Sequence, residues 1–149
     1  MSVIRPAAIE EAAIVGAQRR AMFFDMGYRD GLDTMVEAFV PWVIEKMRAG
    51  EYLGWFAVAE DGAIAAGAGL WLMDWPPHMI GPGSRGNILN VYTEPGYRRQ
   101  GLARRLTETA IDWCRAYGIG TVILHASEEG RELYRSLGFE RTNEMRRSV

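Results

Sequence analysis

The residues with the clearest capacity for chemistry lie around Gly101, where an arginine-rich loop precedes an amphipathic segment. Glycine at this position lets a ligand approach the backbone closely, and Ala103 leaves the first turn of a helix uncrowded. The unpaired N–H groups of that turn and the positive end of the helix dipole together attract an anion. Arg98, Arg99 and Arg104 add formal charge, and a forked guanidinium matches phosphate oxygens well. The sequence therefore predicts a phosphate-binding site here.

Two glycine patterns bear on which phosphate ligand binds. A P-loop has Gly, four residues, Gly, Lys and then Ser or Thr, but Leu102 and Ala103 follow Gly101 where the lysine and the hydroxyl belong. Nucleotide hydrolysis is therefore not indicated. The segment from Gly81 to Gly86 matches the dinucleotide pattern G-x-G-x-x-G, but it precedes a predicted strand instead of joining a strand to a helix. We interpret that match as accidental.

Hydrophobic periodicity divides the rest of the chain into strands followed by alternating strands and helices. Apolar residues at steps of three and four predict helices at 9–26, 32–49, 101–118 and 130–137, with glycines at their ends. Runs of β-favouring residues predict strands at 3–5, 52–59, 63–73, 87–93 and 121–125, and a last strand from Phe139 onward. Asp61-Gly62 is a hairpin turn signal. The anion loop thus joins a strand to a helix.

Two prolines bear on the helix boundaries. Pro6 suits the first turn of a helix, because its missing N–H is not needed there. Pro41 lies inside the second predicted helix, where a proline removes a hydrogen bond and clashes with the preceding turn. We therefore expect the segment at 32–49 to be kinked or divided in two.

Length and composition limit the class of protein. The 149 residues are enough for one domain with its own core, so we expect a single domain over 1–149. The opening residues contain no long apolar run, which predicts a cytoplasmic location and no membrane partner. A net charge of −2 gives no general attraction to nucleic acid. Cys114 is the single cysteine, and we expect a buried structural thiol.

Two separated motifs agree with one known family in order and spacing. The loop reads Arg98-x-x-Gly101-x-Ala103, and some thirty residues later the chain reads Leu133-Tyr134-x-x-Leu137-Gly138-Phe139. In both motifs this chain resembles the GNAT superfamily of N-acetyltransferases, whose loop signature is Arg or Gln, two residues, Gly, one residue, and Gly or Ala. The resemblance covers the second half of the chain well and the first half in outline.

The resemblance implies a fold, an activity and a cofactor. The fold is of the α/β (α+β) class, with a mixed, largely antiparallel central sheet flanked by helices. The activity is direct acetyl transfer from acetyl-CoA, as co-substrate, to a primary amine. The strand at 87–93 splays from the next strand, so that its backbone can bond the pantetheine arm and polarise the thioester carbonyl. The implied cofactor-binding residues are Val91, Tyr92, Thr93, Arg98, Arg99, Gln100, Gly101, Leu102, Ala103, Arg104 and Ser127.

The resemblance also implies one catalytic residue. Tyr134 stands at the position of the family tyrosine that protonates the departing CoA thiolate, and a phenol held near the sulfur is a plausible general acid. Ser127 stands where many members have asparagine, seven residues before that tyrosine. The base that deprotonates the amine is left open among Glu94, Asp74, His78 and ordered water.

The acceptor and the partners are less defined by sequence. The acceptor is a small-molecule or peptide amine, and an aromatic and methionine cluster lines its pocket or else belongs to the core: Met22, Phe23, Phe24, Met26, Tyr28, Trp71, Met73 and Trp75. His78 and His125 lack metal-ligand spacing, so no metal is expected. A homodimer could form through an exposed last strand. The alternative functions are a non-catalytic acyl-CoA sensor and, with less support, a nucleotide-binding regulator.

Overall fold

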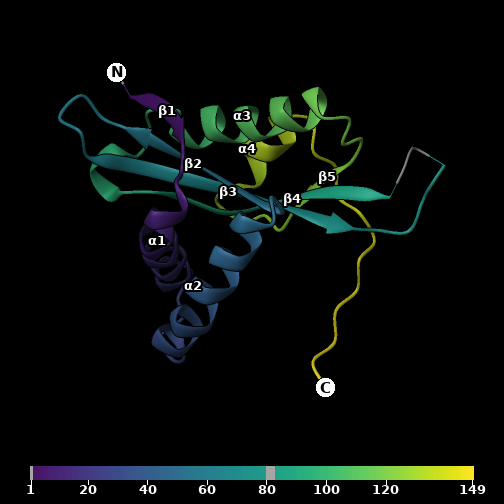
Figure 1. The fold of residues 1–149 in the computed structure, drawn as a ribbon, viewed down its shortest axis with the longest axis horizontal. Coiled ribbons are helices and arrows are strands. Elements are labelled where there is room, and N and C mark those ends of the chain that lie inside the picture. Colours follow the sequence, from purple (N-terminus) through teal and green to yellow (C-terminus); the bar gives the residue numbers. More distant parts are fainter. Residues whose placement is uncertain (1, 80–82) are drawn as a thin grey trace.

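A five-stranded sheet lies at the centre of the computed structural model, which describes residues 2–79 and 83–149 (Figure 1). The strands neighbour one another in chain order: β1 (Val3–Pro6), β2 (Tyr52–Val58), β3 (Ile64–Asp74), β4 (Ser84–Thr93) and β5 (Val122–Leu124). The first three pairings are antiparallel, and only β4 and β5 run parallel. This arrangement confirms the predicted mixed, largely antiparallel sheet.

Helices cover both faces of the sheet (Figure 1). On one face lie α1 (Ala12–Asp25) and α2 (Leu32–Arg48), and on the other lie α3 (Leu102–Ala116) and α4 (Arg131–Ser136). Two short 3₁₀ helices, η1 (Ile9–Glu11) and η2 (Pro95–Tyr97), precede α1 and α3. Within the described residues, the predicted helices at 9–26, 101–118 and 130–137 are therefore confirmed in position, with slightly different ends.

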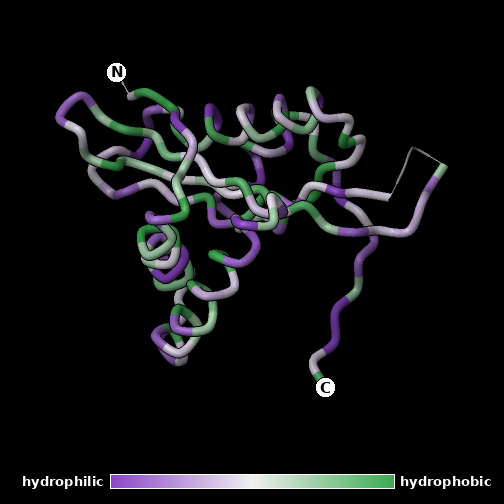
Figure 2. Tube along the Cα trace, in the orientation of Figure 1, coloured by the Kyte–Doolittle hydropathy of each residue, from purple (hydrophilic) through white to green (hydrophobic). Residues whose placement is uncertain are grey.

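Each face of the sheet has its own apolar core. The α3-side core is built from strand residues and one stripe of α3: Ala68, Leu70, Ile88, Leu102, Leu106, Ala110 and Cys114. The α1/α2-side core contains Val15, Phe39, Val43, Tyr52 and Phe56. In Figure 2 hydrophobic and hydrophilic residues alternate along the helices, as expected of helices that bury one face.

The β2–β3 hairpin forms where the sequence predicts it. The Asp61 carboxylate accepts a 3.0 Å hydrogen bond from the Ala63 N–H, and Gly62 has a φ of 87°. Glycine adopts this left-handed conformation without steric cost, which is why Asp-Gly favours a tight turn. The hairpin prediction at 52–73 is confirmed.

The structure contradicts the prediction for Pro6 and the predicted division of the second helix at Pro41. Pro6 ends β1 and pairs with Trp55 instead of opening a helix. It is tolerated there because β1 is an edge strand, on which a missing donor need not break a ladder. Pro41 lies inside one continuous helix, α2. Its missing bond would have used the Glu37 carbonyl, and both residues are exposed, so water can satisfy that oxygen while Phe39 and Val43 bury the opposite side.

The predicted last strand is also absent. Residues 139–149 contain no strand or helix, and the chain extends away from the sheet as a largely hydrophilic segment (Figures 1 and 2). Its large apolar residues Met145 and Val149 bury nothing, since both are at least 95% exposed. The edge of the sheet on this side is therefore β5. Residues 81 and 82 of the Gly81–Gly86 pattern lie outside the described residues, but Ser84 does open a strand.

Candidate functional site

The parallel pair of strands separates halfway along β4. The pairing with β5 extends from Gly86 to Ile88 and stops where β5 ends at Leu124. Within the described residues, Leu89–Thr93 of β4 has no partner strand on that side. Backbone polar groups on this free edge are available to a ligand, as expected for a strand that splays from its neighbour.

A bulge in β4 lies within this free stretch. Leu89 pairs with Gly69 and Tyr92 with Gly67, so Asn90 and Val91 together oppose Ala68. Asn90 has a φ of 57°, a left-handed conformation that asparagine tolerates better than most residues. The extra residue inverts the alternation of side chains: Leu89 packs against the α1/α2-side core, while Val91 packs against the α3-side core.

Behind the bulge lies a buried polar network that sequence analysis did not single out. Asn90 is 3% exposed; its Oδ1 accepts a 2.7 Å bond from Arg19 of α1, and its Nδ2 donates a 3.0 Å bond to the Tyr52 hydroxyl. Burial raises the pKa of Tyr52 to about 12, so this phenol stays neutral.

Two glycines of β3 make room for this network. A Cβ on Gly69 would overlap the Tyr52 hydroxyl, and a Cβ on Gly67 would overlap the buried amide of Gln18. Glycine inside a strand often marks such a close approach. The alternation of Gly67 and Gly69 in an otherwise apolar strand was the sequence signal that could have indicated polar side chains beneath the sheet.

The loop after β4 presents a row of free amides. Arg99 and Gly101 have φ values of 63° and 76°, and the first bond of α3 is donated by the Arg105 N–H to the Gly101 carbonyl. Within the described residues, the N–H groups from Arg99 to Arg104 donate to no backbone carbonyl. Donors that follow one another through left-handed residues form an anion-binding concavity, and the helix dipole reinforces it. Among the described residues other than its chain neighbours, none lies within 4 Å of a Cβ built on Gly101, so the backbone there is open to a ligand.

The structure divides the three predicted arginines between different tasks. The Arg98 guanidinium donates to the Thr93 carbonyl at 3.0 Å and pairs with Asp25 of α1 at 2.6 Å, which raises the pKa of Arg98. Arg104 donates to the Ser136 hydroxyl and so ties the first turn of α3 to α4. Arg99 and Gln100 are exposed, and Arg99 has no ion pair among the described residues. Arg98 and Arg104 therefore brace the site, while Arg99 faces solvent.

Tyr134 lies half-buried in α4. Its ring packs edge-on against Phe139 at 5.9 Å, and burial raises the pKa of its phenol. Ser127 accepts a 3.1 Å bond from the Gly130 N–H just before α4. Gly130 itself leaves space for the tyrosine, since a Cβ there would lie 2.9 Å from its ring. Among the described groups, no protein partner bonds the Tyr134 hydroxyl, so the phenol is available to a ligand.

The candidate bases do not lie together. Glu94 directly follows β4, whereas Asp74 pairs with Ser84 at the other end of the β3–β4 ladder. The nine residue steps of β4 between Ser84 and Thr93 span about 30 Å. Glu94 and Asp74 therefore cannot serve one amine, and His78 lies beyond Asp74 in the chain. The sheet leaves Glu94 as the candidate nearest the bulge.

This architecture and loop match one family model. The acetyltransferase (GNAT) family model matches residues 19–139, which include the sheet from β2 to β5, the loop and α4. The chain belongs to this family. It is an N-acetyltransferase of the GNAT type, and the resemblance noted in the two motifs is confirmed.

Solved structures show the same fold over the whole chain. A GCN5-related N-acetyltransferase from Ralstonia eutropha JMP134 is 35% identical, with a TM-score of 0.93 over 100% of this chain and 99% of that one. A predicted acetyltransferase from Clostridium acetobutylicum, crystallised with acetyl-CoA, is 26% identical, with a TM-score of 0.92 over 100% of this chain and 96% of that one.

A curated relative matches a shorter stretch. Mycothiol acetyltransferase from Beutenbergia cavernae is 32% identical over 105 residues, which make up 64% of this chain and 33% of that protein. The chain thus spans about a third of the length of that relative. Both full-length structural matches carry the GNAT fold from β1 to the C-terminal segment.

The predicted aromatic cluster of this GNAT protein is divided into two groups. Phe23 packs edge-on against Tyr28 at 5.6 Å, and Trp71 packs against Trp42 of α2 at 5.4 Å. Among the described residues, no ring contact joins the first group to the second. Phe24, Met26 and Tyr28 are 43%, 50% and 56% exposed, so the α1 end of the cluster is a surface and not a core.

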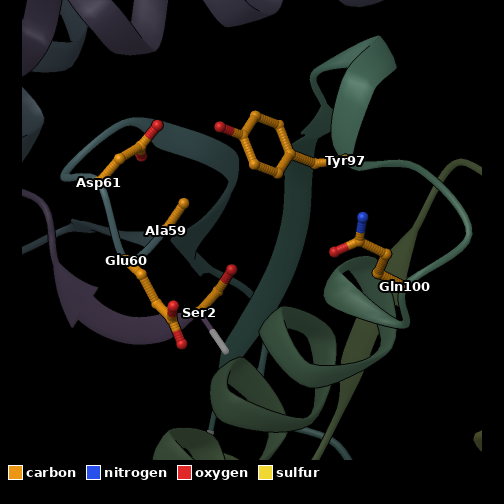
Figure 3. A pocket seen from close by; sticks show the side chains of 6 residues that line it. All are labelled: Ser2, Ala59, Glu60, Asp61, Tyr97 and Gln100. Carbon is orange, nitrogen blue, oxygen red and sulfur yellow. The ribbon is translucent and has the colours of Figure 1, made fainter.

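A cavity lies beside the loop, not at the free edge of β4. It has a volume of about 320 Å³ and is lined by Ser2, Ala59, Glu60, Asp61, Tyr97 and Gln100. Figure 3 shows Tyr97 pointing toward the β2–β3 turn, with Gln100 on the loop next to it. Only Gln100 belongs to the predicted cofactor-binding set, so this cavity borders the site without containing it.

The described residues offer neither a metal-binding cluster nor a membrane-spanning helix. No group of three His, Cys, Asp or Glu side chains there is placed to hold a metal ion. No helix among them is long and apolar enough to span a bilayer. The candidate site of this GNAT protein thus consists of main-chain donors, arginines and one tyrosine.

Proposed function

We propose that this N-acetyltransferase takes the acetyl group from acetyl-CoA and passes it directly to a primary amine of a small molecule or peptide. The observation that carries the proposal is the row of free amides from Arg99 to Arg104, which directly follows the free edge of β4. The crystal structure of the Clostridium acetobutylicum relative with acetyl-CoA supports the choice of cofactor.

In this proposal the loop binds the pyrophosphate of the cofactor. The main chain of Arg99, Gln100, Gly101, Leu102, Ala103 and Arg104 supplies the donors, and the Arg99 side chain adds charge. Arg98 contributes by fixing the loop to Thr93 and Asp25, because its guanidinium is already bonded to both. The binding energy therefore comes mainly from backbone groups held in place by arginines.

The free edge of β4 would hold the pantetheine arm and the thioester. Main-chain groups at Val91, Tyr92 and Thr93 lie beyond the end of β5, where a carbonyl oxygen of the thioester can accept a backbone N–H. One well-placed donor of this kind contributes about 3–4 kcal/mol to transition-state stabilisation. Placing a strand edge against the thioester therefore supplies much of the catalysis.

Tyr134 is the proposed general acid. The amine nitrogen attacks the thioester carbonyl carbon, the C–S bond breaks, and the departing thiolate takes the phenolic proton, while the amine loses its extra proton to water or to a base. Burial raises the pKa of Tyr134, so the phenol enters the reaction protonated. Ser127 enters the proposal through its bond to Gly130, which sets where α4 begins.

The first test is the melting temperature with acetyl-CoA, with ATP and NAD as controls. A ligand at about a hundredfold its dissociation constant adds roughly 2.7 kcal/mol to the free energy of unfolding. We expect a rise with acetyl-CoA alone, and a smaller rise in Arg99→Ala. The exposed tail variant Arg147→Ala is the matched control. No rise in folded wild-type protein would remove the cofactor assignment.

The second test separates an enzyme from a sensor. Tyr134→Phe should bind acetyl-CoA as wild type does but release CoA thiol more slowly with an accepted amine, whereas Tyr117→Phe, on a tyrosine that is 68% exposed, should not change the rate. Undiminished transfer by Tyr134→Phe would contradict the general-acid role. Tight binding by wild type with no turnover over a wide amine panel would favour a non-catalytic sensor.

A further inference from the structure

We propose that Asn90, Arg19 and Tyr52 are positioning residues that hold the β4 bulge in the shape that directs its backbone donors at the thioester. This inference rests on the proposed function, since it concerns the same free edge of β4. It assigns a role to three side chains that lie on the other face of the sheet from α3, behind the strand edge that the cofactor would use.

The bulge determines which groups the free edge presents. In a regular strand Leu89 and Val91 would lie on the same face, but here they pack against opposite cores. The extra residue at Asn90–Val91 therefore shifts the register of β4 by one residue, and each later side chain points to the opposite face from the one it would occupy in a regular strand. The backbone N–H and C=O groups that point away from β3, toward the place where β5 has ended, depend on this register shift.

The conformation of Asn90 is sustained by its side chain. A φ of 57° in the middle of a strand is costly for most residues, and asparagine tolerates it partly because its amide can bond locally. In this structure both ends of the amide are used, by Arg19 at 2.7 Å and by the Tyr52 hydroxyl at 3.0 Å. The side chain thus fixes the bulge from behind.

Arg19 bonds the Asn90 side chain through its guanidinium and, among the described residues, forms no ion pair. Its guanidinium lies 4.9 Å from the ring centres of both Phe23 and Phe39, and no carboxylate pairs with it among the described residues. Its Nε is buried and has no hydrogen-bond partner within the part of the chain that the structure describes. A half-buried cation without a carboxylate partner costs free energy, and the contacts that hold Arg19 are these two rings and the Asn90 amide. Orienting Asn90 accounts for its placement.

The third member is accommodated by the neighbouring strand. Tyr52 is 3% exposed, and its hydroxyl occupies the space that a side chain on Gly69 would fill. Because Gly69 pairs with Leu89, the residue just before the bulge, β3 admits the hydroxyl at the very point where β4 departs from regular geometry. Helix α1, strand β2 and strand β3 thus all contribute to one local backbone shape.

The experiment measures thioester polarisation directly, so it needs no known acceptor. Carbonyl-labelled acetyl-CoA is bound to each variant, and isotope-edited infrared spectroscopy records the shift of the carbonyl stretch to lower frequency on binding. Asn90→Gly keeps the left-handed backbone accessible but removes both hydrogen bonds. Asn90→Asp keeps an acceptor for Arg19 and for the Tyr52 hydroxyl. Asn143→Gly, in the exposed C-terminal segment, is the matched control.

We expect Asn90→Gly to bind acetyl-CoA within about threefold of wild type, because the phosphate loop is unchanged, but to lose most of the infrared shift. Asn90→Asp should recover part of it, and Asn143→Gly should match wild type. With any accepted amine, kcat for Asn90→Gly should fall by about tenfold to a hundredfold, as for misplacements of about 1 Å. Tyr52→Phe, which removes only the bond from Asn90, should lose less of the infrared shift. It replaces Asn90→Gly as the test variant if Asn90→Gly does not fold.

An unchanged infrared shift in folded Asn90→Gly or Tyr52→Phe overturns the inference and leaves the network a purely structural one. Loss of affinity in step with the shift would likewise overturn it, because the network would then support binding and not carbonyl placement. If wild type fails to bind acetyl-CoA, the proposed function fails and this inference falls with it. The wild-type measurement therefore separates the two failures.

Discussion

The two faces of the sheet are stabilised in different ways. On the α3 side, Leu102, Leu106, Ala110 and Cys114 form an apolar stripe, and the buried polar residue Thr107 returns its hydroxyl to the Ala103 carbonyl of its own helix. On the α1/α2 side, by contrast, three polar side chains are buried between helix and sheet: Gln18, Asn87 and Asn90. One face is an ordinary core, and the other contains groups whose burial costs free energy.

This difference indicates where the molecule gives up stability for chemistry. A buried amide that lacks a partner costs about 1–3 kcal/mol, and the Asn87 oxygen has none among the described residues. An apolar residue in place of Asn90 would remove both bonds that hold the β4 bulge. Substitutions on the α3 side should therefore mainly lower the free energy of unfolding, whereas substitutions on the α1/α2 side should mainly lower turnover.

The largest expected effect is on the α3 side. Leu106 is fully buried, so Leu106→Ala should lower the free energy of unfolding by about 2–5 kcal/mol through lost burial and the cavity left behind. Urea denaturation measures this loss, with Met145→Ala, at a residue that is 95% exposed, as the control. A loss below 1 kcal/mol would show that this core is loosely packed.

A substitution on the other face should cost less stability and more function. Gly69→Ala places a methyl group against the Tyr52 hydroxyl, and such overpacking costs about 1–3 kcal/mol. Gly96→Ala, where the new Cβ meets no described residue within 4 Å apart from its chain neighbours, should be neutral. Thermal denaturation and CoA release would be measured together. If Gly69→Ala lowered stability but left turnover of the folded protein unchanged, the contrast between the faces would be wrong.

A smaller effect is expected at the ion pair that links helix α1 to the loop after β4. Asp25 of α1 pairs with Arg98 of the loop, and both side chains are about 45% exposed. Since solvent screens such pairs, Asp25→Asn should cost only about 0.2–1 kcal/mol, and added salt should reduce the difference from wild type. Chemical denaturation at two salt concentrations measures it. A salt-independent loss would indicate packing instead of charge.

The last effect is confined to acid pH and concerns Glu11 at the start of α1. Hydrogen bonds from Arg5 and from the Ala8 N–H lower the pKa of Glu11 from 4.5 to about 2. A carboxyl with a lowered pKa stabilises the fold above pH 4.5, and this contribution is lost as the pH falls from 4.5 toward 2. Glu11→Gln should therefore lose less stability over that range than wild type. Equal acid sensitivity in the two proteins would assign the loss to other carboxyls.

The sequence predicts those parts of the fold that local pattern controls. Asp61-Gly62 specifies its hairpin because two adjacent residues determine the turn, and the stripe from Leu102 to Cys114 specifies α3 because one face is apolar throughout. Pro41 misled the prediction because its cost depends on which side of the helix faces water. The last strand failed because residues 139–149 alternate charges with too few apolar residues to bury.

Of the candidate site, the sequence likewise predicts only the part that a local pattern controls. Gly101 and its neighbours predict a loop with free backbone N–H groups from local sequence alone, and the structure has such a loop. The positions of Arg98 and Arg104 could not be read from the chain, because their partners Asp25 and Ser136 are distant in sequence. Asn90 was missed for the same reason: its two partners come from α1 and β2, and only the glycines of β3 hinted at them.

The burial of Cys114 simplifies the assay of this protein. The thiol is 1% exposed on the α3 side, and burial raises its pKa to about 11, so it is both shielded and un-ionised at neutral pH. It is also the single cysteine of the chain. A colorimetric thiol reagent added during turnover should therefore register the coenzyme product alone, and a slow rise without substrate would report unfolding of the enzyme.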